Sequence, residues 1–109
     1  MAWLVRDGEV LGPLEIATSF RDRSRGLLGR DGIEGALLLR PALSVHTFRM
    51  RFPIDVAFCD RRMRVIDTVT MAPNRPGRPR LRARSVLEAE AGAFRRWGLA
   101  KGDQLDVRP

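Results

Sequence analysis

The sequence predicts a mainly β domain with one packed α-helix, built as a β-sandwich of jelly-roll type or as a small barrel. Six to seven short segments have the composition and alternation of strands, and one segment has a substantial helical pattern. Turn signals based on glycine, proline and aspartate separate these segments at short intervals. With 109 residues the chain has the length of one domain, so we expect a single domain over residues 1–109.

The first two strands are expected at residues 3–5 and 10–17. The Asp7-Gly8 pair between them is a common hairpin turn. Pro13 indicates an edge position or an irregularity in the second strand, because proline lacks a backbone donor.

A helix is expected over residues 20–28. Ser19 and Asp22 resemble a capping box at its start, and Gly29 is placed to end it. The helical spacing puts three apolar side chains on one face, those of Phe20, Leu27 and Leu28. We expect this face to pack against the sheet.

The remaining elements follow from short apolar runs and turns. Residues 36–39 predict a buried strand, and residues 54–60 and 63–69 form the clearest hairpin, which turns at Arg61-Arg62. A strand at residues 85–90, about one helical turn within residues 92–99, and a last strand at residues 104–108 complete the chain.

The charge distribution points to an exposed basic loop. The net charge is +7, and five arginines without an acid occupy the loop 75–84, namely Arg75, Arg78, Arg80, Arg82 and Arg84. Interleaved prolines exclude a helix there. Such a loop is either a solvated surface or a site that neutralises phosphates of nucleic acid, although no aromatic residue in it offers a stacking platform.

Several classes of protein are excluded by composition. One cysteine cannot form an internal disulfide, and with one histidine it cannot complete a four-ligand Cys/His zinc site. The longest apolar run, residues 36–39, is far shorter than the ~20 residues of a membrane span, and the first residues lack a signal-peptide pattern. We therefore expect a soluble cytoplasmic domain without metal, cofactor or membrane span, of undetermined oligomeric state.

Polar residues concentrate around the approach to the strand at residue 54. His46, Thr47 and Arg51 precede Pro53, and Asp55 follows it on the strand face opposite Ile54. A covered carboxylate needs a partner, for which His46 or an arginine is the obvious choice. Two interpretations remain open, an acid–base pair of His46 with Asp55 or a buried polar network that holds a loop.

Arginines of the expected helix form a second cluster. Arg23 and Arg30 lie seven residues apart on one face, where they would clamp an anion or pair with Asp55 or Glu88. Gly26 costs a helix interior about 1 kcal/mol relative to alanine, which indicates close contact between its backbone and the sheet.

Four spaced motifs occur in a fixed order along the chain. They are Arg23-x-x-Gly26-Leu27-x-x-Arg30, His46-Thr47-x-x-Met50-x-x-Pro53-Ile54-Asp55, Val86-Leu87-Glu88-x-x-Ala91-Gly92 and Gly98-Leu99-x-x-Gly102-Asp103. Together they resemble the domain-of-unknown-function 192 family, also called uncharacterised protein family 0127, over about residues 14–107, and the His46-Thr47 pair resembles its His-Thr branch. The resemblance implies a compact jelly-roll-like domain and implies no established activity.

These observations favour a non-enzymatic binding or accessory module for an anionic ligand or an acidic protein surface. The predicted ligand-binding residues are Arg23, Arg30, His46, Thr47, Arg51 and Asp55, and the predicted structural residues are Gly26, Pro53, Glu88, Gly92, Gly102 and Asp103. One alternative is a small hydrolase or isomerase that uses His46 and Asp55 as catalytic acid and base. The other is a nucleic-acid-associated accessory protein that binds through the loop 75–84.

Overall fold

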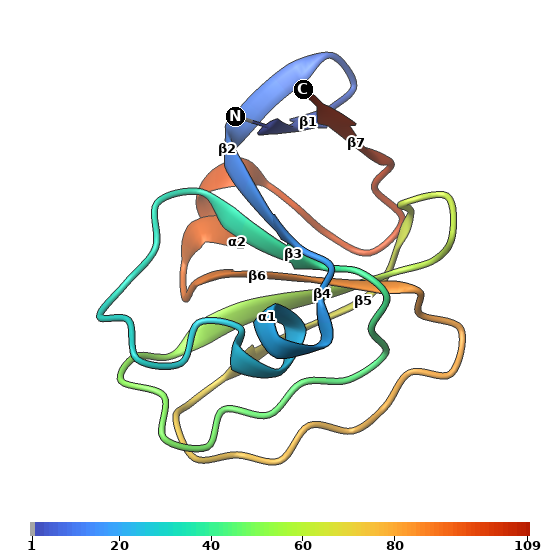
Figure 1. Cartoon of the computed structure of the whole chain (residues 1–109). Coiled ribbons are helices and arrows are strands. Elements are labelled where there is room, and N and C mark those ends of the chain that lie inside the picture. The colour runs from blue at the N-terminus through green and yellow to red at the C-terminus, as the bar shows by residue number, and fades with distance from the viewer. Residues whose placement is uncertain (1) are drawn as a thin grey trace.

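A computed structural model, which describes residues 2–109, shows one seven-stranded sheet with two short helices (Figure 1). The elements are β1 (Ala2–Arg6), β2 (Glu9–Ala17), α1 (Phe20–Arg25), β3 (Ala36–Leu39), β4 (Ile54–Cys59), β5 (Val65–Met71), β6 (Ser85–Glu90), α2 (Ala93–Trp97) and β7 (Leu105–Arg108). The strand order is β5-β4-β6-β3-β2-β1-β7, and among these pairs only β2 and β3 are parallel. The predicted mainly β fold is confirmed.

The sheet curls until its two edge strands meet at one end. The N–H of Val65 donates to the carbonyl of Asp103 at 2.9 Å, and the N–H of Leu105 donates to the carbonyl of Met63 at 2.9 Å. The result is a half-barrel that is closed at the start of β5. Of the two predicted architectures, a single curled sheet is nearer to the small barrel than to the sandwich.

One hydrophobic core lies on the inner face of this curl. It collects buried side chains from all seven strands and from α2, among them Leu4, Leu14, Leu38, Cys59, Val65, Leu87, Phe94 and Leu105. Since every strand contributes to it, this core is the inside of the half-barrel. Helix α2 packs there through Ala93 and Phe94.

A second core covers the outer face of the central strands. Its buried side chains include Leu37, Leu39, Ile54, Val56, Phe58 and Val86 from the sheet, with Leu27, Met50 and Ala83 from the segments above it. Since successive residues of a strand face opposite sides of a sheet, Asp55 belongs to the inner face and Glu88 to the outer face.

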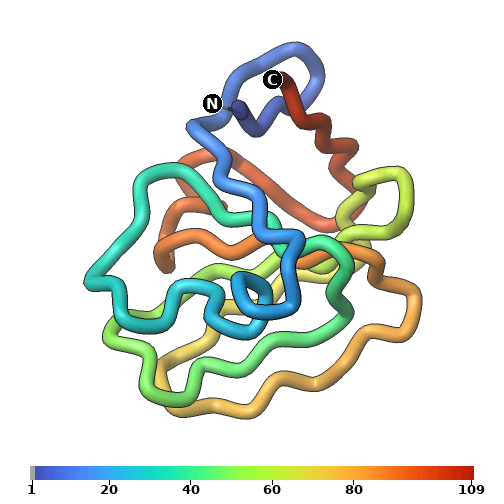
Figure 2. Tube along the Cα trace, viewed as in Figure 1, coloured from blue at the N-terminus to red at the C-terminus, as the bar shows by residue number. Residues whose placement is uncertain are grey.

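Two long loops, residues 40–53 and 72–84, lie side by side over the outer face (Figures 1 and 2). The N–H of Ala42 donates to the carbonyl of Arg84 at 3.0 Å, and the N–H of Thr47 donates to the carbonyl of Arg75 at 2.9 Å. A Cβ atom on Gly77 would lie 1.7 Å from the carbonyl oxygen of Val45. Only glycine allows this approach, so the loop 72–84 is a packed part of the fold.

Helix α1 differs from its prediction. The cap is formed as expected, because the Ser19 hydroxyl accepts from the N–H of Asp22 at 3.1 Å. The helix nevertheless ends after Arg25, since Gly26 has φ +50°, and none of its residues is buried. Phe20 is 78% exposed, and the buried Leu27 follows the helix. The expected end at Gly29 and the expected packing of Phe20 on the sheet were therefore wrong, and α2 is the packed helix.

Four residues predicted to be structural lie in turns or at the ends of elements. Pro53 directly precedes β4, and Gly92 is the N-cap of α2. Gly92 and Gly102 have φ values of +98° and +95°, which disfavour a Cβ atom. Asp103 forms an ion pair with Arg6 at 3.2 Å, which joins the turn before β7 to β1. Within residues 2–109, neither helix has the length and apolar character needed to cross a membrane.

Candidate functional site

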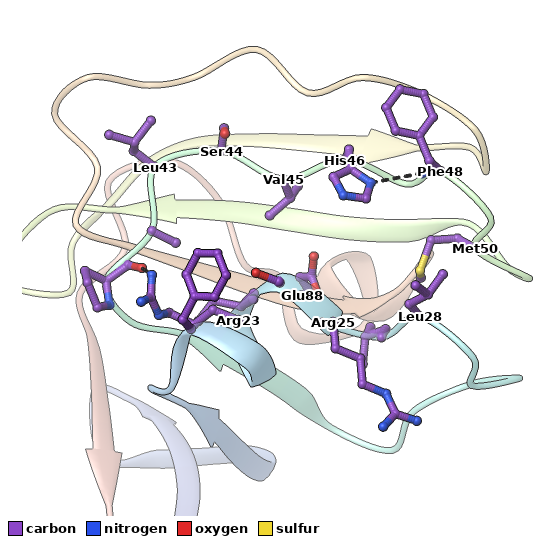
Figure 3. Close-up of a pocket in the computed structure, with 17 residues that line it drawn as sticks. Arg23, Arg25, Leu28, Leu43, Ser44, Val45, His46, Phe48, Met50 and Glu88 are labelled. Atoms are coloured by element: carbon purple, nitrogen blue, oxygen red, sulfur yellow. Dashed lines mark hydrogen bonds between the residues drawn. The ribbon is translucent and has the colours of Figure 1, made fainter.

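A cavity of about 300 Å³ lies between α1 and the segment 41–50 on the outer face of the sheet (Figure 3). Three elements supply its polar and aromatic lining: Phe20, Arg23, Ser24 and Arg25 of α1, Ser44, His46 and Phe48 of the segment 41–50, and Glu88 of β6. Gly26 and Leu27 line it directly after the helix. Figure 3 shows Glu88 between the two walls, with the segment that carries His46 on one side and α1 on the other.

Glu88 is the unusual group in this cavity. Its side chain is held between apolar neighbours, because Leu37 of β3 and Val56 of β4 are its partners across the sheet. Glu88 is 4% exposed, and within residues 2–109 its Oε1 atom is completely buried without a hydrogen-bond partner. Burial disfavours the ionised form and raises the pKa of the Glu88 carboxyl to about 7. Near neutral pH this carboxyl is thus poised between its two protonation states.

Gly26 makes room beside this carboxyl. A Cβ atom at Gly26 would lie 3.1 Å from Oε1 of Glu88. The positive φ of Gly26 also ends α1 at this point, so that the chain turns towards the buried Leu27. The same glycine therefore shapes both the helix end and the floor of the cavity.

His46 faces the cavity from the opposite wall. Its Nδ1 atom accepts a hydrogen bond from the N–H of Phe48 at 3.3 Å, and the two rings stack with centroids 5.1 Å apart. In Figure 3 the imidazole points from its loop towards the side on which Glu88 lies. The stack fixes the ring while its Nε2 atom has no partner within residues 2–109.

The two arginines of the lining have different roles. Arg23 donates from Nε to the carbonyl of Thr18 at 3.1 Å and from Nη1 to the carbonyl of Pro41 at 3.0 Å, which joins α1 to the segment 41–50. Arg25 is exposed, forms no ion pair within residues 2–109, and extends away from Glu88 in Figure 3. The guanidinium of Arg25 lies near Gly29, which is not part of the cavity lining, so Arg25 adds positive charge beside the cavity.

Apolar side chains surround the mouth. Phe20, Leu43 and Phe48 are 78%, 40% and 47% exposed, and all three line the cavity. Exposed large apolar residues that gather around a hollow are a common feature of ligand-binding sites. The cavity thus has an apolar rim, basic groups near the mouth and a carboxyl on its floor.

Asp55 lies on the other face of the sheet. Its Oδ2 atom accepts hydrogen bonds from the N–H groups of Gly92 at 2.9 Å and Phe94 at 3.1 Å, and its Oδ1 atom accepts from the Thr70 hydroxyl at 2.7 Å. It therefore holds the start of α2 against β4 and β5. The structure does not bring Asp55 together with His46, because strand alternation places Asp55 inside the half-barrel.

Two predicted ligand-binding arginines form ion pairs outside the cavity. Arg30 binds both carboxylate oxygens of Glu15, at 2.7 and 3.0 Å, and this contact lowers the pKa of Glu15. Arg51 pairs with Asp31 at 3.0 Å on an exposed surface. Neither reaches Asp55 or Glu88.

Thr47 holds the two long loops together. It is fully buried, its hydroxyl donates to the carbonyl of Ala72 at 2.6 Å, and the same oxygen accepts from the N–H of Arg75 at 2.9 Å. Thr47 thus stabilises the segment 41–50, which forms one wall of the cavity. Of the six predicted ligand-binding residues, the structure places Arg23 and His46 in the cavity.

The basic loop is fixed at Arg80. The guanidinium lies 4.1 Å from the centre of the Phe58 ring and donates to Asp67 at 2.9 Å, which lowers the pKa of Asp67. The other four arginines of the loop 75–84 are exposed.

Residues 2–109 contain no group of three His, Cys, Asp or Glu side chains arranged to hold a metal ion. Burial raises the pKa of the Cys59 thiol to about 12, so this cysteine is not an activated nucleophile.

Sequence reasoning did not predict that the exposed Phe20 and Arg25 line a cavity, and it assigned Glu88 a structural role. One signal was present for Glu88: an acid within the strand 85–90, between the apolar residues Leu87 and Ala89. A carboxyl in such a strand requires a partner or a functional reason. The missing information was which loop covers that face of the strand.

The chain matches the DUF192 family model, described as "Uncharacterized ACR", over residues 2–107. It is 35% identical over 86 residues to the UPF0127 protein PH1112 of Pyrococcus horikoshii, which covers 74% of this chain and 75% of that protein. It is 34% identical over 100 residues to a UPF0127 protein of Thermococcus gammatolerans, and it spans 65% of the length of that relative. A protein of unknown function from Novosphingobium aromaticivorans has the same fold, with a TM-score of 0.81, 20% identity, and coverage of 96% of this chain and 82% of that one.

Proposed function

Since the chain belongs to the DUF192 family, whose description assigns no activity, we propose its function from the cavity itself: the domain is a non-enzymatic binding module, and the cavity between α1 and the segment 41–50 is its ligand site. Its predicted cytoplasmic location is part of the same proposal.

The observation that carries the proposal is the buried, unpartnered carboxyl of Glu88 in a cavity of about 300 Å³. Burying a carboxyl without a partner destabilises a fold, and Glu88 has the one fully buried side-chain oxygen or nitrogen without a hydrogen-bond partner in residues 2–109. A leucine at this position would pack with its neighbours Leu37 and Val56. The carboxyl is therefore better explained by binding than by stability.

The ligand carries an anionic group that lies at the mouth. Arg23 and Arg25 supply positive charge to the lining, and the whole chain has a net charge of +7, which attracts anions to its surface. The exposed rings of Phe20 and Phe48 offer apolar contact to the body of the ligand. An anionic small molecule fits these features, as does an acidic side chain of a partner protein.

The two alternative functions have less support. An acid–base mechanism through His46 and Asp55 needs both groups at one substrate, and they lie on opposite faces of the sheet. A nucleic-acid role would rely on the exposed arginines of the loop 75–84, beside which no exposed aromatic ring of the loop itself provides stacking.

The test is a screen of aromatic carboxylates by amide NMR. We expect para-methylbenzoate to shift the amide signals of Gly26, Ser44 and His46. Binding that shifts the loop 75–84 alone, or no binding by any carboxylate of the screen, would contradict the proposal.

Two matched arginine variants locate the site. Arg25→Gln removes a charge beside the cavity and is expected to weaken binding of para-methylbenzoate several-fold. Arg51→Gln removes an equally exposed charge that is paired with Asp31 outside the cavity, and is expected to leave the affinity unchanged. Equal losses in both variants would show general attraction to the basic surface.

A further inference from the structure

Glu88 lacks a partner although three basic or titratable side chains share its cavity. Arg23 donates to two carbonyl groups, and Arg25 extends away from the floor. His46, on the segment 41–50, accepts from the N–H of Phe48 and makes no hydrogen bond with Glu88. Within residues 2–109 the protein thus supplies neither a counter-charge nor a hydrogen-bond donor to the Glu88 carboxyl.

We propose that Glu88 is the counter-ion for a protonated nitrogen group at the buried end of the ligand, so that the ligand is a small molecule with an ammonium or amidinium at one end and an anion at the other. This inference rests on the proposed function, because it concerns the same cavity.

The arrangement of charges supports a ligand with two opposite ends. A carboxylate accepts hydrogen bonds and favours cations, and such charge-assisted bonds are stronger than neutral ones. The apolar neighbours Leu37 and Val56 flank the Glu88 side chain, and low-dielectric surroundings strengthen the attraction between a carboxylate and a cation. The arginines would repel a simple cation at the mouth, whereas an anionic tail next to Arg25 removes that penalty.

Gly26 and the cavity volume limit the size of the ligand group that can reach Glu88. Gly26 has no side chain beside Oε1 of Glu88, and a Cβ atom there would come within 3.1 Å of this oxygen. The backbone of Gly26 thus packs against Oε1 with no side chain in between, while Glu88 still contributes to the lining of the cavity. The cavity of about 300 Å³ has the size of the smallest typical small-molecule pockets, which indicates a compact ligand.

Binding of this ligand is coupled to a proton. The protonated carboxyl cannot pair with a cation, so the bound nitrogen group favours the ionised form of Glu88. A complex formed at pH 6 therefore releases a proton from Glu88, and affinity rises between pH 6 and 8. Arg23, Arg25 and His46 are the charged or titratable groups that line the cavity with Glu88, so the pH profile is compared with that of a His46→Gln variant.

Three probes of one shape separate the two ends of the ligand. Para-aminomethylbenzoate carries both groups, para-methylbenzoate only the anion, and benzylamine only the cation. We expect para-aminomethylbenzoate to bind at least about tenfold more tightly than either of the others at pH 8. Calorimetry in buffers of different ionisation enthalpy counts the released protons.

The variant Glu88→Gln keeps the shape of the side chain and removes the charge. It is expected to reduce the affinity for para-aminomethylbenzoate to that for para-methylbenzoate, and to leave the latter affinity intact. If para-methylbenzoate binds in the cavity as tightly as para-aminomethylbenzoate, or if Glu88→Gln binds both as the unmodified protein does, the nitrogen proposal is overturned while the binding function stands. If none of the three probes shifts the cavity amides, both proposals fall.

Discussion

The Oδ2 atom of Asp55 accepts a hydrogen bond from the N–H of Phe94 at 3.1 Å across the inside of the half-barrel. The same oxygen also accepts from the N–H of Gly92, at the cap of α2. One carboxylate thus supplies the N-terminal hydrogen bonds of a five-residue helix that has no cap side chain of its own. Asp55 therefore stabilises the position of α2 relative to β4.

Replacing Asp55 with alanine is expected to destabilise the protein by about 2–3 kcal/mol, because three donors, of which the N–H of Phe94 is buried, lose a charged acceptor. Thr70→Val is the control, since it removes one of the three bonds, and it should cost about 1 kcal/mol. Urea unfolding followed by tryptophan fluorescence measures both values. Equal costs for the two variants would contradict the assignment of Asp55 as the anchor of α2.

Glu88 is expected to make stability depend on pH. Its pKa is about 7 in the folded protein against an ordinary value of 4.5, so the folded state retains the proton longer than the unfolded state. Stability from this group is fully present below pH 4.5 and falls as the pH rises to about 7, by about 3 kcal/mol in total.

The Glu88→Gln variant removes this loss. The difference in unfolding free energy between variant and unmodified protein should grow in favour of the variant from pH 4.5 to about 7 and then stay constant. Glu34→Gln, at an exposed position, controls for the loss of one carboxyl. A constant difference over the whole range would show that the Glu88 carboxyl is solvated in solution.

Gly26→Ala is expected to cost more than an ordinary glycine replacement. Gly26 has φ +50° and ψ −128°, a backbone conformation that costs an L-residue about 1–3 kcal/mol, and the added Cβ also approaches Glu88. Gly8→Ala is the reference, because Gly8 has φ +80° and a Cβ there meets nothing within 4 Å. Thermal unfolding compares the two variants.

A double-mutant cycle isolates the contact between Gly26 and Glu88. If the Cβ at position 26 presses on the carboxyl, Gly26→Ala should cost less in a Glu88→Ala background than in the unmodified protein. If the costs of Gly26→Ala and Glu88→Ala are additive, the whole cost of Gly26→Ala comes from the backbone of Gly26.

Thr47→Val is expected to loosen the wall of the cavity. The substitution removes the hydroxyl that binds the carbonyl of Ala72 and the N–H of Arg75, and should cost about 1–3 kcal/mol. Hydrogen exchange at the Arg75 amide should accelerate, whereas exchange in the central strand β4 should follow only the change in global stability. Unchanged exchange at Arg75 would show that Thr47 does not join the loops.

The sequence predicts elements well where the signal is local. The strands at residues 36–39 and 85–90, the hairpin turn at Asp7-Gly8 and the Ser19 cap all depend on neighbouring residues, and all are confirmed. The predicted helix, residues 20–28, is longer than α1 because a glycine such as Gly26 can lie within a helix or can end one. Its φ of +50° is set by the position of Leu27 on the sheet, which is a tertiary effect.

The candidate site was predicted less well because it depends on which face of each strand is covered, and by what. The alternation of β4 places Asp55 opposite Ile54, but only the curl of the sheet shows that the face of Asp55 is the inside. The cavity around Glu88 is formed by α1 and the segment 41–50, which lie over 35 residues away in the chain. No local sequence pattern shows that Glu88 lies close to these two segments.

The pairing of β1 with β7 has a practical consequence for any experiment that needs the protein attached to a support. Trp3 lies opposite Arg108, so the start of β1 and the end of β7 lie side by side, at the end of the molecule remote from α1 (Figures 1 and 2). An affinity tag or a tether at either end therefore leaves the mouth of the cavity facing solution. For the same reason a short peptide linker between the two ends is compatible with a circularly permuted chain, with new ends placed in the exposed Arg61-Arg62 turn.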